Sequence, residues 1–336
     1  MVDLPVLQGE PQGCAPGPLT RRAKPDWLRV RAPGGERYTF IKKTLRERGL
    51  FTVCEEARCP NVGECWAGGT ATFMLLGQIC TRGCRFCAVT AGNPAGRVDA
   101  QEPSKLAESV ALLELSYVVL TMVDRDDLDD GGAAHVAACI EHLKQRQPKL
   151  IIEALVGDFN GHGDAVDTLC DTGLEVFAHN LETVEAMQRT VRDARCGYAK
   201  SLAVLERAKR HPLRPLTKSS LMLGLGESDA QLRRSMQDLR SVGVDFLTLG
   251  QYLQPTSKHL DVVEWVPPER FAQLREFGER LGFAYVASGP LVRSSYRAGE
   301  FFVASLVEAR RSGGPLAVGA RSVERASTGE GTWASC

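Results

Sequence analysis

The sequence lacks net charge, a long hydrophobic run and any segment typical of export. Its 41 basic residues balance 41 acidic ones, which argues against a nucleic-acid partner. No apolar stretch approaches the roughly 20 residues that cross a bilayer, so we expect a soluble protein with no membrane contact. Residues 1–25 carry prolines at positions 5, 11, 16, 18 and 25, too many for a targeting helix or a secretory signal. We therefore expect a cytoplasmic protein.

Cysteine, by contrast, is plentiful and unevenly spread. Six of the eleven cysteines lie between positions 54 and 87 as two triplets, Cys54, Cys59 and Cys65, then Cys80, Cys84 and Cys87. Clustered thiols without a secretory signal indicate a reducing compartment, where they bind metal more often than they form disulfides. Both triplets are therefore candidate metal sites.

The second triplet has the spacing C-x3-C-x2-C, which gathers three thiolates on one short loop. Soft thiolates select iron–sulfur clusters or zinc. Structural zinc normally takes four protein ligands, whereas this loop offers three. We therefore predict an iron–sulfur cluster with one iron open to another ligand.

The stretch CTRGCRFC at 80–87 resembles the cluster motif of the radical S-adenosylmethionine (SAM) superfamily. Further stretches resemble the lipoyl synthase family within it: the C-x4-C-x5-C triplet, TMVDRDDLDDGGA at 121–133, HNLETV at 179–184 and RSSY at 293–296. The resemblance runs from about residue 38 to about residue 305, and no core motif in this range departs from the family pattern.

This resemblance implies two [4Fe-4S] clusters, with SAM bound at the open iron of the cluster on Cys80, Cys84 and Cys87. It implies a sulfurtransferase of lipoate biosynthesis, which inserts two sulfur atoms at the sixth and eighth carbons of a protein-bound octanoyl-lysine chain. The auxiliary cluster on Cys54, Cys59 and Cys65 would be the sulfur donor. Spacing alone indicates only a second metal site there, and a structural zinc site is the alternative.

The auxiliary cluster needs a fourth ligand, because three thiolates cannot complete it. The resemblance favours Ser295 of RSSY, which follows the last strand-like run. A serine oxygen is a hard, weak ligand for iron, suited to a site that opens when sulfur leaves. Arg293 is expected to stabilise negative charge nearby. The alternative is that Ser294 and Ser295 cap a turn.

The resemblance also implies protein partners. The substrates would be octanoylated lipoyl carrier domains, namely the E2 subunits of 2-oxoacid dehydrogenases and the H protein of glycine cleavage. An electron donor such as ferredoxin or flavodoxin and a cluster-repair protein are expected as well. Residues 20–50 hold ten basic residues against three acidic ones. This segment either docks an acidic carrier or is a solvated face.

Short, nearly all-apolar runs predict parallel strands buried on both faces. They are FMLLGQI, VVLTMV, IIEALV, LEVFA, SLMLGL, FLTLG and FAYVA, starting at residues 73, 118, 151, 174, 220, 246 and 283. Helical segments lie between them, one starting at Ser228 with Gln231 in capping-box relation. The pattern predicts βα units and an α/β fold, a partial TIM-type (β/α)6 barrel with N- and C-terminal extensions carrying the auxiliary cluster.

This organisation divides the chain into four parts. Residues 1–37 are expected to form a flexible basic arm, and 38–70 the auxiliary-cluster extension. Residues 71–311 are expected to form the barrel with its C-terminal RSSY extension, and 312–336 a disordered tail.

Candidate SAM contacts lie near the ends of predicted strands, where barrel enzymes place catalytic groups. They are Asp124, Glu153, Asn180 and Glu182, whose acid and amide groups suit an amino group and ribose hydroxyls, and Gly224 and Gly226, where backbone can approach a ligand. The alternatives are capping or barrel-core hydrogen bonds for the polar residues and an ordinary turn for the glycines.

The other cysteines are predicted to have no ligand role. Cys139 and Cys170 lie on apolar helical stripes, so both are expected to be buried small hydrophobes. Cys14, Cys196 and Cys336 have no thiol near them in the sequence. Two rival functions remain open: a different radical enzyme sharing the second triplet, and a non-catalytic zinc module.

Overall fold

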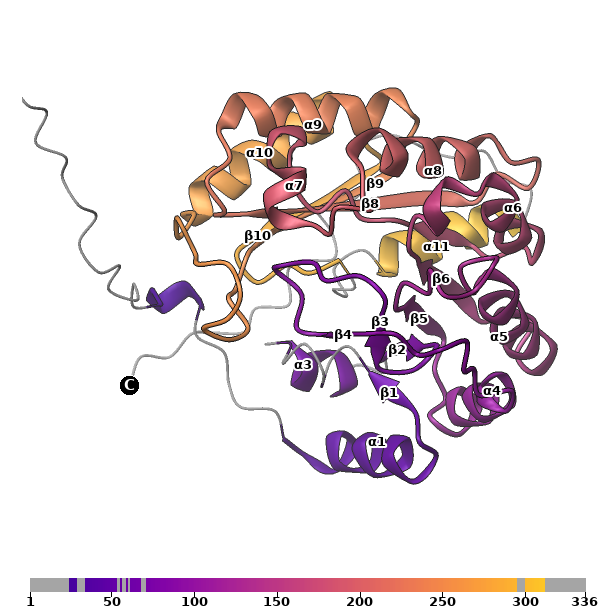
Figure 1. Cartoon of the computed structure of the whole chain (residues 1–336). Helices are drawn as coiled ribbons and strands as arrows, with labels where there is room; N and C mark the ends of the chain where they lie inside the picture. The colour runs from indigo at the N-terminus through magenta and orange to yellow at the C-terminus, as the bar shows by residue number, and fades with distance from the viewer. Residues whose placement is uncertain are drawn as a thin grey trace, which may run out of the picture.

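The computed structural model describes residues 24–28, 34–52, 55, 59, 61–67, 71–294 and 300–311. Cys14, Cys54, Ser295 and Cys336 lie outside this set, as do the predicted tail and most of the predicted basic arm. Figure 1 shows an outer layer of helices around a sheet, with the N-terminal helices beside its first strands. Among the described residues no helix has the length and apolar character needed to cross a membrane.

Seven parallel strands form the sheet, and they coincide with the seven predicted apolar runs. In spatial order they are β2 (Ala71–Leu75), β5 (Tyr117–Met122), β6 (Ile151–Leu155), β7 (Val176–Ala178), β8 (Leu216–Leu223), β9 (Phe246–Gln251) and β10 (Tyr285–Gly289). A two-residue strand, β1 (Phe51–Thr52), pairs antiparallel with β2 at the edge. The strand order follows the chain order, as repeated βα units require.

The sheet remains open in the described residues, with β1 at one edge and β10 at the other. The predicted α/β fold is therefore confirmed, whereas a closed barrel is not formed. Six crossovers connect the seven parallel strands, consistent with the six units predicted.

Helices precede the first strand, occupy the connections between the parallel strands and follow the last strand. They are α1 (Glu36–Glu47), α3 (Val62–Ala67), α4 (Glu102–Leu112), α5 (Ala133–Arg146), α6 (Gly163–Asp171), α7 (Gln188–Val191), α8 (Tyr198–Arg210), α9 (Asp229–Ser241), α10 (Pro268–Arg280) and α11 (Glu300–Arg311), with 3-10 turns η1 (Asp26–Leu28), η2 (Phe159–Gly161) and η3 (Glu185–Met187). The predicted capping box is present: Gln231 N–H donates to Ser228 Oγ, and Ser228 N–H donates to Gln231 Oε1.

Both faces of the sheet are buried, which explains the continuous apolar runs. Val118, Leu120 and Ile152 face the core shared with α4, α5 and α6. On the opposite face Tyr117 and Ile151 pack against α11. Because side chains alternate along a strand, α11 fills the inner side of the sheet near the amino ends of the strands. The carboxyl ends are left to carry the site.

Candidate functional site

The loop carrying the second triplet differs from its prediction in one respect. The first predicted strand, FMLLGQI, ends directly before Cys80 in the sequence, but β2 ends at Leu75. Cys80 instead lies in a two-residue strand, β3 (Ile79–Cys80), paired with β4 (Thr90–Ala91) in a separate small sheet. Gly77, with a φ of +88°, turns the chain between the two strands. Residues 76–92 therefore form a loop with its own two-stranded sheet, which follows the carboxyl end of β2.

Buried groups fix the start of this loop. Leu76 N–H donates to Glu102 Oε2 at 3.0 Å, and Arg125 Nη1 donates to the Leu76 carbonyl. His135 Nε2 lies 2.6 Å from the same Glu102 oxygen. Cys139 is fully buried beside this pair, so its predicted burial is confirmed, as is that of Cys170.

Thr81 and Arg82 attach the cluster loop to the carboxyl ends of the neighbouring strands. Thr81 N–H donates to the Asp124 carbonyl after β5 at 2.9 Å. The buried Arg82 guanidinium lies 2.8 Å from Asp126 and 2.7 Å from Asp158, which follow β5 and β6. Burial alone would lower the pKa of Arg82, but its hydrogen bonds to these two carboxylates raise it above the ordinary value. The loop is thus held by a permanently charged, fully paired group.

Cys84 is held from the segment after β7. Gly83 N–H donates to Asp193 Oδ2 at 2.8 Å, and Asp193 N–H donates to Cys84 Sγ at 3.3 Å. Arg85 N–H donates to the Val191 carbonyl. Hydrogen bonds from Arg195 and from Gly83 lower the pKa of Asp193 despite its partial burial.

Cys87 is held from the segment after β9, where His259 Nε2–H donates to the Cys87 carbonyl at 2.9 Å. His259 was not predicted as a site residue from the sequence, and neither were Asp193, Arg82 and Arg195. The pattern DRDD and the acidic and basic residues at 192–195 were the available signals, but nothing in the sequence pairs them with a loop more than 40 positions away.

Three of the predicted cofactor contacts converge on this loop. Burial, followed by the charges of Glu182 and Asp124, raises the pKa of the Cys87 thiol. Asn180 Nδ2 donates to Glu182 Oε1 at 3.1 Å. Burial raises the pKa of Asp124 to about 6, with the Arg82 charge opposing the shift. Two carboxylates therefore lie close to a candidate cluster thiol, at the carboxyl ends of β5 and β7.

Glu153 is not brought to this position. It is the third residue of β6 and is buried on the inner face, where Lys218 Nζ donates to it at 2.8 Å and Tyr117 Oη at 2.7 Å. This arrangement matches the barrel-core alternative, and a SAM contact by Glu153 stays a prediction.

Gly224 and Gly226 follow β8, with φ values of +95° and +110°. A Cβ on Gly224 would lie 2.2 Å from Gln251 Nε2 and 2.4 Å from the Glu264 carbonyl oxygen. The side chain of Glu227 also accepts from the N–H groups of Gly224 and Leu225. Internal packing is thus sufficient reason for glycine at 224, and the predicted cofactor contacts remain untested.

The described part of the first triplet lies beside the chain segment that ends at RSSY. Asn61 Nδ2, between Cys59 and Cys65, donates to the Leu291 carbonyl at 2.7 Å. Arg293 lies close enough to Cys59 for its charge to oppose the burial that raises the pKa of that thiol. Residues 61 and 291 are far apart in the sequence, so the segment before RSSY comes beside the described part of the first triplet at Leu291 and Arg293. The place of Ser295 lies outside the described residues and stays a prediction.

The donor atoms present fit iron–sulfur clusters. Cys80, Cys84 and Cys87 form a half-buried set of soft sulfur donors, and burial raises the pKa of Cys80 to about 11. Such thiols become thiolates when a metal replaces the proton. Beside Cys59, Arg293 Nη2 is buried without a hydrogen-bond partner, as expected of a group that faces an anionic cluster.

Cys196 is an unexpected neighbour of the cluster loop. It looks isolated in the sequence, yet one residue joins it to the cluster loop: Asp193 N–H donates to Cys84 Sγ, and Cys196 N–H donates to the Asp193 carbonyl at 2.9 Å. The neighbouring Cys84 thiol lowers the pKa of the Cys196 thiol to about 7. Arg82 Nη1 also donates to Cys196 Sγ at 3.5 Å. Because 112 positions separate the two cysteines, spacing could not reveal the contact.

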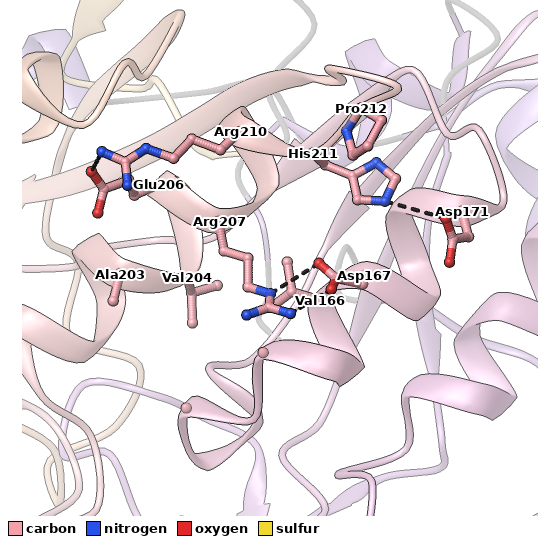
Figure 2. Close-up of a pocket in the computed structure, with 12 residues that line it drawn as sticks. Val166, Asp167, Asp171, Ala203, Val204, Glu206, Arg207, Arg210, His211 and Pro212 are labelled. Carbon is pink, nitrogen blue, oxygen red and sulfur yellow. Dashed lines mark hydrogen bonds and ion pairs between the residues drawn. The ribbon is translucent and has the colours of Figure 1, made fainter.

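A separate groove lies between α6 and α8, away from these cysteines (Figure 2). Its volume is about 740 Å³. Arg207 pairs with Asp167, Arg210 with Glu206 and His211 with Asp171 across or along it. Each of these side chains thus has a partner within the groove, and none of the six candidate cluster cysteines lines it.

Comparisons with known proteins agree with this geometry. The family profile "Radical SAM superfamily" matches residues 74–239, and "N-terminal domain of lipoyl synthase of Radical_SAM family" matches 17–59. The lipoyl synthase of Ectopseudomonas mendocina is 54% identical over 88% of this chain and 85% of its own length. That of Halorhodospira halophila is 58% identical over 83% of each chain, and the chloroplastic lipoyl synthase of Ricinus communis is 54% identical over 88% of this chain and 84% of its own.

Among solved structures, methylornithine synthase superposes with a TM-score of 0.51 over 83% of this chain and 94% of its own, at 13% identity. At this identity the likeness shows the fold alone.

Proposed function

We infer the function from one premise: this chain belongs to the lipoyl synthase family of radical SAM enzymes. It is a sulfurtransferase of lipoate biosynthesis that depends on SAM and iron–sulfur chemistry. Its reaction inserts sulfur at the sixth and eighth carbons of an octanoyl chain carried on a lysine of a protein domain. The observation that supports this function most strongly is the anchoring of the Cys80–Cys87 loop to the carboxyl ends of the strands, through the bonds from Thr81 to Asp124, from Gly83 to Asp193 and from Arg85 to Val191.

We assign the radical-generating site to Cys80, Cys84 and Cys87. When bound there, a [4Fe-4S] cluster supplies the electron for cleavage of SAM to methionine and a 5′-deoxyadenosyl radical. Asp124 and Glu182 supply negative charge suited to the amino group of SAM. The bonds from Thr81, Gly83 and Arg85 to neighbouring loops fix the cysteines before the cofactor arrives, so less ordering is needed on binding.

We assign the sulfur-donating cluster to Cys54, Cys59 and Cys65, with Ser295 as its fourth ligand. Sulfur is the chemistry that this group supplies. Arg293, whose Nη2 is buried and unpaired beside Cys59, would hold negative charge there. Asn61 joins the triplet to the segment leading to Ser295. The zinc alternative predicts a colourless protein that is indifferent to SAM.

The fourth-ligand proposal has its own test. Ser295→Ala should keep 5′-deoxyadenosine formation but bind the auxiliary cluster less stably and lose lipoyl product, whereas Ser294→Ala should be milder. Iron content and product are measured together. Full product yield from Ser295→Ala would remove this residue from the site.

The proposed partners are octanoylated carrier domains, a small electron-transfer protein and a cluster-repair protein, all within the cytoplasm. In α1 and the residue after it, Lys42, Lys43, Arg46 and Arg48 each pair with an acidic residue of this chain. Docking through the basic segment would therefore use mainly its earlier residues. If it occurs, turnover of an intact carrier should fall more steeply with salt than turnover of an octanoyl-lysine peptide.

The overall test is an anaerobic assay of the reconstituted protein with SAM, a reductant and an octanoylated lipoyl domain. Mass spectrometry should detect 5′-deoxyadenosine and a lipoyl group on the domain. Cleavage of SAM without any thiolated product, from protein that carries both clusters, would overturn the sulfur-insertion assignment.

A further inference from the structure

The contact between Cys84 and Cys196 is fixed by the backbone on both sides. The cluster loop and the segment after β7 are joined by the bonds from Gly83 to Asp193 and from Arg85 to Val191. Arg195 adds a bond from its guanidinium to the Thr81 carbonyl. None of these bonds involves a metal ligand atom. The two thiols are therefore held together by the protein frame itself.

Packing does not account for a cysteine at position 196. Cys139 and Cys170 are fully buried and belong to the hydrophobic core. Cys196 is instead half-buried, lies outside the described hydrophobic clusters, and accepts a hydrogen bond from Arg82. Nor does cluster binding call for it, because Cys80, Cys84 and Cys87 already supply the three thiolates. A thiol at this position touches one reactive group, the thiol of Cys84.

We propose that Cys84 and Cys196 form a reversible disulfide in the cluster-free protein when it meets a peroxide. In the first step hydrogen peroxide oxidises one thiol to a sulfenic acid and releases water. The second thiol then attacks the sulfenic sulfur, forming the S–S bond and releasing another water. A dithiol reductant returns both thiols by exchange.

The disulfide and the cluster exclude one another, since both use the sulfur of Cys84. This consequence rests on the proposed function, whereas formation of the disulfide does not. Without a thiol neighbour, a sulfenic acid on Cys84 could proceed to sulfinic and sulfonic acids, which thiol reductants do not reverse. Cys196 thus preserves Cys84 for reloading after the cluster is lost.

Trypsin separates the relevant cysteines cleanly. Cleavage after Arg82, Arg85 and Arg195 places Cys84 in the peptide 83–85 and Cys196 in the peptide 196–200, apart from Cys80 and Cys87. The experiment treats cluster-free, reduced protein with an equivalent of hydrogen peroxide, blocks the remaining thiols and analyses the digest by mass spectrometry. We expect 83–85 linked to 196–200, with the link lost after dithiol treatment.

Variants then test whether Cys196 protects Cys84 from irreversible oxidation or only lies close to it. After peroxide and dithiol treatment, the parent and Cys14→Ser should regain full iron loading on reconstitution. Cys196→Ser should regain several-fold less, with two or three oxygen atoms added to peptide 83–85. A parent disulfide that joins Cys84 to Cys87 or Cys80 to Cys87, or equal recovery by Cys196→Ser, would overturn the proposal.

Experiments on protein that has not been exposed to peroxide test the assigned function separately from the disulfide. Untreated Cys196→Ser should load iron and form 5′-deoxyadenosine like the parent. If neither protein binds a cluster through Cys84, the function assigned to that loop fails, while the mapped disulfide stands on its own result.

Discussion

The two cysteine triplets are held in different ways. Thr81, Gly83, Arg85 and the Cys87 carbonyl each make a bond to a segment following β5, β7 or β9. In the described part of the first triplet, Asn61 bonds to the Leu291 carbonyl and Arg293 lies beside Cys59. Several strand ends frame the second triplet. The described part of the first triplet instead lies beside α1, where Tyr38 packs on Trp66, and beside the segment at Leu291 and Arg293.

This difference matches the roles proposed for the two clusters. A cluster that passes electrons must survive every turnover, so a loop anchored by many metal-independent bonds suits it. A cluster that loses sulfur must open, and a place beside helices and a chain segment, outside the frame of strand ends, suits that role. The comparison predicts that damage to the first frame stops all chemistry, whereas damage to the second stops only sulfur insertion.

The largest effect is expected from Cys84→Ala. Loss of one of three thiolates should leave the radical-generating cluster unable to hold SAM, so 5′-deoxyadenosine should fall to background. The fold should change little, because the anchoring bonds come mainly from backbone and neighbouring residues. Circular dichroism provides the control, and 5′-deoxyadenosine at the parent rate would contradict the assignment.

Cys59→Ala should separate the two activities. The first cluster remains, so 5′-deoxyadenosine should still form within about twofold of the parent rate, while lipoyl product falls to background. Both products are quantified from the same anaerobic reaction. Lipoyl formation by this variant would show that the first triplet is not the sulfur source.

Gly250→Ala should disturb the segment near the first triplet without touching a cysteine. A Cβ on Gly250 of β9 would lie 2.1 Å from the Val292 carbonyl oxygen, so residues 291–293 must shift. Displacements near 1 Å can cost roughly 10²-fold in rate, and we expect a loss of that order in lipoyl product with SAM cleavage retained.

Gly289→Ala is the matched control for Gly250→Ala. Gly289 pairs with Gly250 in the neighbouring strand, and its Cβ would meet only the Val292 side chain, at 3.4 Å. Equal product loss in both variants would point to general damage to the sheet rather than to the position of Arg293.

The smallest effect concerns His179, whose partner Ser201 also accepts a hydrogen bond from Arg192, the residue before Asp193. Its Nδ1–H donates to the Val156 carbonyl and its Nε2 accepts from Ser201 Oγ, both fully buried. Burial, followed by the charge of Arg192, lowers its pKa from 6.5 to about 4. The unfolded chain therefore binds a proton first as pH falls, and stability should decline between about pH 6.5 and 4 by about 3 kcal/mol.

His179→Gln should flatten this acid limb, measured as the free energy of unfolding by urea at several pH values. His142→Gln, at an exposed position on α5, is the control and should leave the limb intact. An unchanged limb in His179→Gln would mean that other groups cause the decline.

Most of the fold could be predicted from local sequence patterns. Apolar runs predicted the seven parallel strands because both faces of the sheet are covered, and Ser228 with Gln231 predicted the start of α9. The cysteine triplets were visible because ligand spacing is local. Glu153 was predicted as a cofactor contact from its place in a strand whose end carries such groups. The sequence could not show its pairing with Lys218, which lies on another strand.

What the sequence could not provide was contact between distant segments. Cys196 looked isolated because its partner lies 112 positions earlier, and Asp193 and His259 showed no sign of supporting the cluster loop. The separate strand at Cys80 was missed because the run from Phe73 to Ile79 is nearly all apolar and predicts one strand. The turn at Gly77 divides it. Such features depend on where the strands end, which is a property of the assembled sheet.

The central claim is that each triplet holds its own four-iron cluster. Anaerobic analysis of iron and acid-labile sulfide per chain tests it most directly. Two clusters require about eight irons and eight sulfides, falling to about four of each in Cys59→Ala and in Cys84→Ala. Zinc with little iron, or about four irons in the parent protein with no further loss in Cys59→Ala, would contradict the account.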